Sequence, residues 1–228
     1  MKRLLICGAA IAMTAAAASA RPVSLALWTF DVTPPVGPGP ITADSGLFGG
    51  TSDVRGNTGG TYDNPVGNGT AESYSCNNWN VGEFWEFRSS STGYNMITIS
   101  WSQTSSNTGP RDFDLQLSTN GGGSYSTVAS YMVLPNATTG GGPWSSGTNF
   151  PVYNFSYSLG VSSDNLADLR IRFTNTSTVS ANLPTPGTVA ATGTDRIDGV
   201  HITGELIPAP GALVLAGFGG FLALRRRR

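Results

Sequence analysis

Lysine and histidine are almost missing from this sequence, and their scarcity removes several kinds of catalysis. Lys2 is the only lysine and His201 the only histidine among 228 residues. Schiff-base chemistry therefore has no amine in the body of the chain. A nucleophile–histidine–acid triad would depend on His201, which stands at a polar position of an alternating stretch, where a surface residue is the usual interpretation. No G-x-S-x-G or H-E-x-x-H motif occurs, so we expect a protein that is not an enzyme.

Cysteine is equally scarce, with one residue near the N-terminus, Cys7, and one in the interior, Cys76. A single interior thiol cannot form a disulfide within the chain or a thiolate zinc site. Cys76 is predicted to be a buried, inert thiol, with pairing between two chains as the alternative. Stability must then come from a hydrophobic core, for which residues 21–207 are numerous enough to form one domain.

Basic charge is also lacking once the two ends of the chain are set aside. Residues 21–207 contain seven arginines and all 14 acidic residues, a net charge of about −7. Such a region has no basic surface for phosphate groups, so we expect no nucleic-acid partner.

The N-terminus, residues 1–20, has the organisation of a secretory signal peptide. Lys2 and Arg3 precede an apolar stretch over residues 4–18, and Ala18-Ser19-Ala20 supplies the small residues that signal peptidase requires. We predict a signal helix that is cleaved after Ala20. An uncleaved anchor is the alternative, but the apolar stretch is short for a span of about 20 residues.

Residues 207–228 form a second signal at the C-terminus. An apolar run over residues 212–224 is followed by four arginines: Arg225, Arg226, Arg227 and Arg228. As a helix, these 13 apolar residues would reach about 20 Å, against a hydrocarbon core of about 30 Å. The arginines should stay on the cytoplasmic side. We therefore predict a short apolar helix that anchors the exported chain transiently in the inner membrane.

Between the signals, residues 21–206 show the alternation that is typical of β-strands and little helical periodicity. The predicted strands lie within residues 24–32, 83–88, 97–101, 112–117, 124–133, 150–159, 168–173 and 200–206. Residues 120–123, Asn-Gly-Gly-Gly, predict a hairpin turn. Residues 33–82 are rich in proline and glycine and predict irregular loops with one short strand. Roughly eight or nine strands with polar outer faces predict an all-β fold, a two-sheet antiparallel β-sandwich of jelly-roll type.

The C-terminal segment resembles the PEP-CTERM protein-sorting signal, in which a short proline motif, an apolar run and an arginine cluster follow one another. The motif here is Pro208, Ala209, Pro210 and Gly211, and Ala209 stands where that family has glutamate. The resemblance implies processing by an exosortase, and a place in the cell envelope, at the cell surface or in an exopolysaccharide matrix. The interior is similar to uncharacterised β-sandwich regions of such proteins at residues 84–87, 109–118 and 195–200.

Two binding sites can be predicted from residue types. Trp79 and Trp144 fall in predicted loops, where indole faces could stack on sugar rings; the alternative is that they cover the edge of the core. Asp31, Asp195 and Asp198 lie near the terminal strands and are candidates for a structural calcium site, because Ca²⁺ prefers carboxylate oxygens.

Carboxylate pairs are the remaining catalytic alternative. Asp112 and Asp114 alternate along one predicted strand and point to the same side, and Glu83 and Glu86 flank Trp85. Such pairs could serve glycoside hydrolysis, whereas a solvated strand face explains them without chemistry. The sequence therefore predicts a non-catalytic structural or polysaccharide-binding protein, with a secreted glycoside-active enzyme as the alternative.

Overall fold

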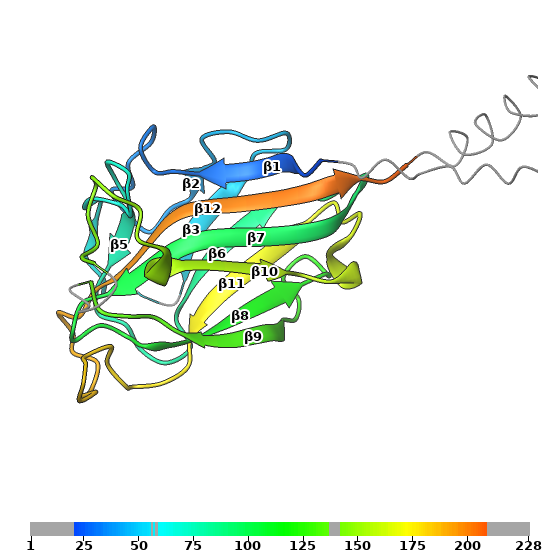
Figure 1. The fold of residues 1–228 in the computed structure, drawn as a ribbon. Helices are drawn as coiled ribbons and strands as arrows, with labels where there is room; N and C mark the ends of the chain where they lie inside the picture. Colours follow the sequence, from blue (N-terminus) through cyan, green and yellow to red (C-terminus); the bar gives the residue numbers. More distant parts are fainter. Residues whose placement is uncertain (1–20, 56, 58, 137–141, 209–228) are drawn as a thin grey trace, which may run out of the picture.

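The computed structural model describes residues 21–55, 57, 59–136 and 142–208, which form two β-sheets packed face to face (Figure 1). The predicted signal helix and the sorting segment from Ala209 onward lie outside these residues. No helix within the described part is long and apolar enough to cross a membrane.

Sheet A is antiparallel, with the order β10-β7-β12-β5-β4, and β1 pairs with a second stretch of β12. Its strands are β1 (Val23–Trp28), β4 (Tyr62–Asp63), β5 (Tyr74–Cys76), β7 (Tyr94–Ser105), β10 (Asn154–Ser158) and β12 (Asp195–Leu206). Two 3₁₀ turns, η1 (Pro151–Tyr153) and η2 (Val161–Ser163), flank β10.

Sheet B is antiparallel as well, with the order β2-β3-β6-β11-β8-β9. Its strands are β2 (Ile41–Thr42), β3 (Thr51–Arg55), β6 (Phe84–Ser89), β8 (Asp112–Ser118), β9 (Ser126–Met132) and β11 (Leu169–Asn175). The chain passes repeatedly from one sheet to the other, as in a jelly roll. The predicted two-sheet antiparallel β-sandwich is confirmed.

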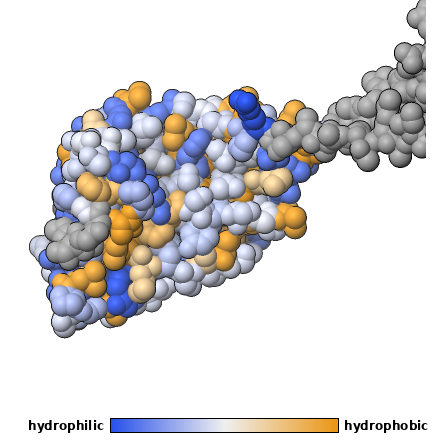
Figure 2. Space-filling model, in the orientation of Figure 1, coloured by the Kyte–Doolittle hydropathy of each residue, from blue (hydrophilic) through white to orange (hydrophobic). Residues whose placement is uncertain are grey.

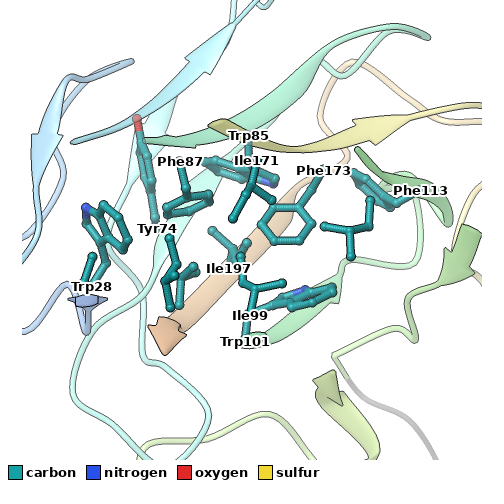
Figure 3. Close-up of a cluster of buried hydrophobic side chains, with 14 of the residues drawn as sticks. Trp28, Tyr74, Trp85, Phe87, Ile99, Trp101, Phe113, Ile171, Phe173 and Ile197 are labelled. Carbon is teal, nitrogen blue, oxygen red and sulfur yellow. The ribbon is translucent and has the colours of Figure 1, made fainter. Parts of the chain in front are cut away.

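Alternating apolar side chains account for the core. In β11, Leu169, Ile171 and Phe173 are buried, while the arginines between them are only partly buried. Large aromatic residues fill the space between the sheets (Figure 3). Trp85 lies among them, with ring centroids 4.7 Å from Tyr74 and 5.2 Å from Trp79. Such side chains each contribute about 2–3 kcal/mol by leaving water, so the core needs no disulfide.

Strand β12 changes partner at a β-bulge in its middle. Residues 195–197 pair with β5, and residues 200–204 pair with β1. The register shifts between Asp198 and His201, where Gly199 has a φ of 58°. This left-handed conformation favours glycine. The bulge allows β12 to pair with β5 along one half and with β1 along the other half of the same edge.

The loop-rich region, residues 33–82, holds more regular structure than predicted. It contains β2, β3, β4 and β5 instead of one short strand. The prediction missed them because each has at most five residues, which is too short for a period to stand out.

Candidate functional site

The outer face of sheet B carries a continuous row of polar side chains across five strands. Register pairs Asp53 with Glu86, Glu86 with Arg172, Arg172 with Gln116, and Gln116 with Thr127. Side chains directly opposite one another share a face of a sheet, so these five residues form one line. We call Asp53, Glu86, Arg172, Gln116 and Thr127, with the flanking rings of Phe84 and Tyr125, the sheet B platform.

Arg172 is fixed at the centre of the platform by two aromatic rings. Its guanidinium carbon lies 3.8 Å from the ring centroid of Phe84, on β6, and 3.5 Å from that of Tyr125, in the β8–β9 connection. Its Nε donates a 2.7 Å hydrogen bond to Oε2 of Glu86. The cation–π contacts hold the guanidinium plane in place, so part of the platform is ordered before any ligand arrives.

Glu86 is the buried acid under this arginine and is only 1% exposed. Its carboxylate accepts hydrogen bonds from Arg88 Nε (2.6 Å), Arg172 Nε and the Tyr125 hydroxyl (2.7 Å). Burial alone would raise the pKa of Glu86, but these donors outweigh it and hold the pKa below its usual value. The pKa of Tyr125 is raised to about 12 by burial and by its bond to Glu86. The charges of this cluster are therefore fixed near neutral pH.

Other polar side chains of this face are also held by neighbours. Gln116 Oε1 accepts a 2.9 Å bond from Thr174. Asp114 accepts bonds from Thr127 (3.1 Å) and Ser130 (2.6 Å) on the adjacent strand β9. The result is a partly exposed surface on which amide, hydroxyl, carboxylate and guanidinium groups are ordered by one another.

The carboxylates considered for glycoside hydrolysis already have partners: Asp112, Asp114 and Glu86 on the outer face of sheet B, and the buried Glu83 just before β6. Asp112 pairs with Arg111 at 2.7 Å and accepts a bond from Ser177 at 2.6 Å. Burial opposes its ionisation, but these partners lower its pKa. Glu83 accepts the backbone N–H of Asn80. A glycosidase needs one carboxylic acid with a raised pKa, and Asp112 and Glu86 are shifted the other way.

The two tryptophans predicted to bind sugar are buried, contrary to the prediction. Trp79 is 4% exposed, donates its indole N–H to the Cys76 carbonyl at 2.9 Å and packs against Trp85. Trp144 is 6% exposed and donates to the Val66 carbonyl. Neither indole has a free face, so the alternative, that they cover the edge of the core, describes them correctly.

The three aspartates considered for calcium do not come together. Asp195 faces the core, Asp198 lies beneath residues 67–70, and Asp31 accepts the backbone N–H of Glu72. Across the described ranges, no three acidic, histidine or cysteine side chains form a group that could hold a metal. The pKa of Asp198 is raised to about 6, chiefly by burial, with the charge of Asp31 adding to the shift.

Asp195 is a fully buried carboxyl whose place in the core was not predicted from the sequence. Its carboxyl accepts hydrogen bonds from Trp85 Nε1 (2.6 Å) and Gln103 Nε2 (2.9 Å). Burial raises its pKa to about 7. The signal was present, because Asp195 is in phase with the inward-facing Ile197 of the same strand.

The remaining titratable candidates are structural. His201 lies on the outer face of sheet A with one ring nitrogen 2.9 Å from the Ser24 hydroxyl, and partial burial lowers its pKa. Cys76 is fully buried, as predicted, and burial raises its pKa to about 12. A thiol in that state is a poor nucleophile.

Comparison with known proteins yields structures only, because no family model and no curated sequence match the chain. The K2 cleaved adhesin domain of Lys-gingipain is similar over 67% of this chain and 87% of its own, with 10% identity and a TM-score of 0.41. TmCBM61, solved with β-1,4-galactotriose, is similar over 68% and 88%, with 10% identity and a TM-score of 0.35. The N-terminal cellulose-binding domain of Cellulomonas fimi β-1,4-glucanase C is similar over 68% and 85%, with 13% identity and a TM-score of 0.32. The fold assignment above rests on the two sheets themselves.

Proposed function

We propose that this chain is an exported, non-catalytic β-sandwich protein that binds polysaccharide through the sheet B platform. The observation that carries the proposal is the cross-strand row centred on Arg172, held between Phe84 and Tyr125. The Gln116 amide and the part-exposed Arg172 guanidinium can bind sugar hydroxyls, while the buried acids Asp53 and Glu86 hold the arginines in place. Ring edges beside them complement the C–H surfaces of a sugar. The internal hydrogen bonds of the platform reduce the entropy lost on binding.

The extent of the platform favours an extended ligand over a compact one. Its partly exposed members run from Phe84 on β6 across β11 and β8 to Thr127 on β9. At about 4.8 Å per strand these four strands span about 14 Å. The arginines of this face are already paired with acids of the same face, such as Arg88 with Asp53 and Arg170 with Asp168. With residues 21–207 acidic overall, a neutral polysaccharide suits this surface better than an acidic one.

Export and sorting form the second part of the proposal and rest on the sequence of residues 1–20 and 207–228. We propose cleavage by signal peptidase, insertion of residues 212–224 in the inner membrane, and processing by an exosortase. Intact-mass measurement of the membrane-bound and released protein from its host tests this. Released protein that still carries Arg225 to Arg228 would contradict the processing step.

Affinity electrophoresis in gels that contain neutral or acidic polysaccharides tests the binding proposal. Gln116→Ala removes a platform amide without leaving a buried charge, and Ser156→Ala on the exposed outer face of sheet A is the matched control. We expect Gln116→Ala to weaken retardation several-fold and the control to leave it unchanged, since one hydrogen bond contributes about 0.5–1.5 kcal/mol. Absence of retardation by every polysaccharide would favour a structural role without a ligand.

A further inference from the structure

The end of the sandwich at which β12 finishes exposes several large apolar side chains. Strand β1 begins and β12 ends at this same end (Figure 1). We call the following group the exit patch, with the exposed fraction after each name: Leu47 57%, Phe48 40%, Met96 63%, Leu206 56% and Ile207 38%. In Figure 2 the face over sheet A is mostly hydrophilic or neutral, and hydrophobic residues occur as small separate patches.

Backbone and ring contacts hold the exit patch together. The ring of Phe48 meets that of Tyr94 edge-on at 5.8 Å, and Tyr94 pairs with Leu206 across β7 and β12. The backbone N–H of Ile207 bonds to Gly93 at 2.9 Å, and that of Leu47 bonds to Ser24 at 3.0 Å. These residues come from three separate parts of the chain, so the fold itself gathers them.

The residues that follow Ile207 indicate that a membrane can cover the exit patch. Only four residues, 208–211, separate Ile207 from the apolar run 212–224. Fully extended, this connection reaches about 17 Å. The polar interface of a bilayer is about 5–8 Å thick on each side. If residues 212–224 enter the hydrocarbon core, the exit patch is held at the membrane surface or directly above it.

We infer that the exit patch rests in the interfacial region of the bilayer while the C-terminal run is inserted, so that the sandwich stands on its end. This inference depends on the membrane insertion proposed above. Apolar side chains are stabilised at the headgroup–acyl boundary, as in proteins that lie on membranes. Arg21, which is exposed two residues before β1 at the same end, adds a guanidinium that can bind lipid phosphates.

The test places a fluorescent dye at the patch in the full chain from Arg21 to Arg228. Leu47→Cys provides the attachment site, and Val36→Cys, 88% exposed in the connection after β1 at the opposite end, is the control. Cys76 is buried and does not compete for the dye. The protein is reconstituted in phosphatidylcholine vesicles with a nitroxide-labelled headgroup, and vesicle flotation measures insertion independently. Met96→Cys repeats the measurement if Leu47→Cys fails to fold.

We expect severalfold quenching of the dye at position 47 and none at position 36 in protein that floats with the vesicles. Floating protein with both dyes unquenched would overturn this inference and leave membrane insertion intact. Protein that does not float would overturn both. Energy transfer between dyes at position 47 without lipid quenching would show that a second copy covers the patch, which also overturns the inference.

Discussion

The buried carboxyl of Asp195 can satisfy all its hydrogen bonds in the neutral, protonated form. Oδ2 lies 2.9 Å from the Ser105 hydroxyl, which is also 2.6 Å from the Pro110 carbonyl. The hydroxyl has one hydrogen, and the carbonyl can only accept it. In the protonated acid, Oδ2–H can donate to Ser105 Oγ and leave the hydroxyl hydrogen for the Pro110 carbonyl, so both acceptors are satisfied. Trp85 and Gln103 both donate to Oδ1, and every polar atom of the acid is satisfied.

This arrangement gives a pH dependence with a definite sign. The pKa of Asp195 is about 7 in the folded protein and about 3.8 unfolded, so the unfolded chain loses this proton first. The contribution of Asp195 to stability is present below about pH 4 and is lost as pH rises to about 7, by at most about 4 kcal/mol. Chemical denaturation of the wild type at pH 4.5 and pH 8, as a difference from Asp195→Asn, measures it.

Asp195→Asn should keep the local hydrogen bonds, because the amide oxygen accepts from Trp85 and Gln103 and the amide N–H donates to Ser105. We expect the stability of this variant relative to the wild type to be clearly higher at pH 8 than at pH 4.5. An equal difference between the variant and the wild type at both pH values would mean that the pKa of Asp195 is not raised in the folded protein. The difference isolates Asp195 from Asp198, whose pKa is also raised.

Tyr125 allows the two contributions of one platform residue to be separated. Tyr125→Phe keeps the ring over Arg172 and removes the hydroxyl that donates to Glu86. We expect a loss of about 1–2 kcal/mol in unfolding free energy, with polysaccharide affinity almost unchanged. Tyr125→Ala removes the ring as well and should weaken both quantities. Urea denaturation and affinity electrophoresis of the pair measure them, and equal affinity loss in both variants would contradict a role for the ring.

At the scale of elements, the alternation of apolar and polar residues predicted where the long strands lie, but it did not predict which strands pair with one another. Phe113, Leu115 and Leu117 mark β8 because each is followed by a polar residue. The turn after β8 has positive φ at Gly121 and Gly122, as the glycine run predicted. The pairing of β11 between β6 and β8 could not be predicted, because register depends on contacts between residues distant in sequence.

The sheet B platform could not be predicted for the same reason, because it depends on strand order and register. The polar positions of β6, β8 and β11 were visible as outward residues, but their joining into one row requires the strand order. Trp79 and Trp144 were misjudged because a loop position in sequence does not reveal burial, and both loops fold back over the core edge. Glu86 was considered as a catalytic acid, and only its three donors show that it is a fixed anion.

The bulge in β12 can be tested at Gly199. A methyl group there meets nothing within 4 Å, so any cost comes from the φ of 58° alone. We expect Gly199→Ala to lower the unfolding free energy by about 1 kcal/mol. Gly147→Ala is the matched control, since its added carbon also meets nothing and its φ is not left-handed. Thermal unfolding of both variants measures the difference, and equal melting temperatures would argue against strain at the bulge.

At the scale of the whole molecule, the two surfaces have different orientations. Figure 1 shows the end of the sandwich where β12 finishes, and the exit patch residues belong to segments at this end. The sheet B platform instead runs across β3, β6, β11, β8 and β9, on a face parallel to the strands. A sandwich that stands on its exit patch therefore presents the platform sideways to the space outside the membrane. In that orientation neither surface blocks the other, so the proposed polysaccharide binding and the proposed anchoring are compatible.

This independence leads to a prediction for the anchored protein. Full chain in vesicles and a soluble chain that ends at Ile207 should bind the same neutral polysaccharide with equal affinity, because the platform residues Arg172 and Gln116 do not contact the exit patch in the described structure. Gln116→Ala should weaken both forms equally. Fluorescence titration of vesicle-bound and soluble protein measures the constants. A much weaker vesicle-bound form would place the platform against the membrane, because only a surface covered by lipid loses its ligand on anchoring.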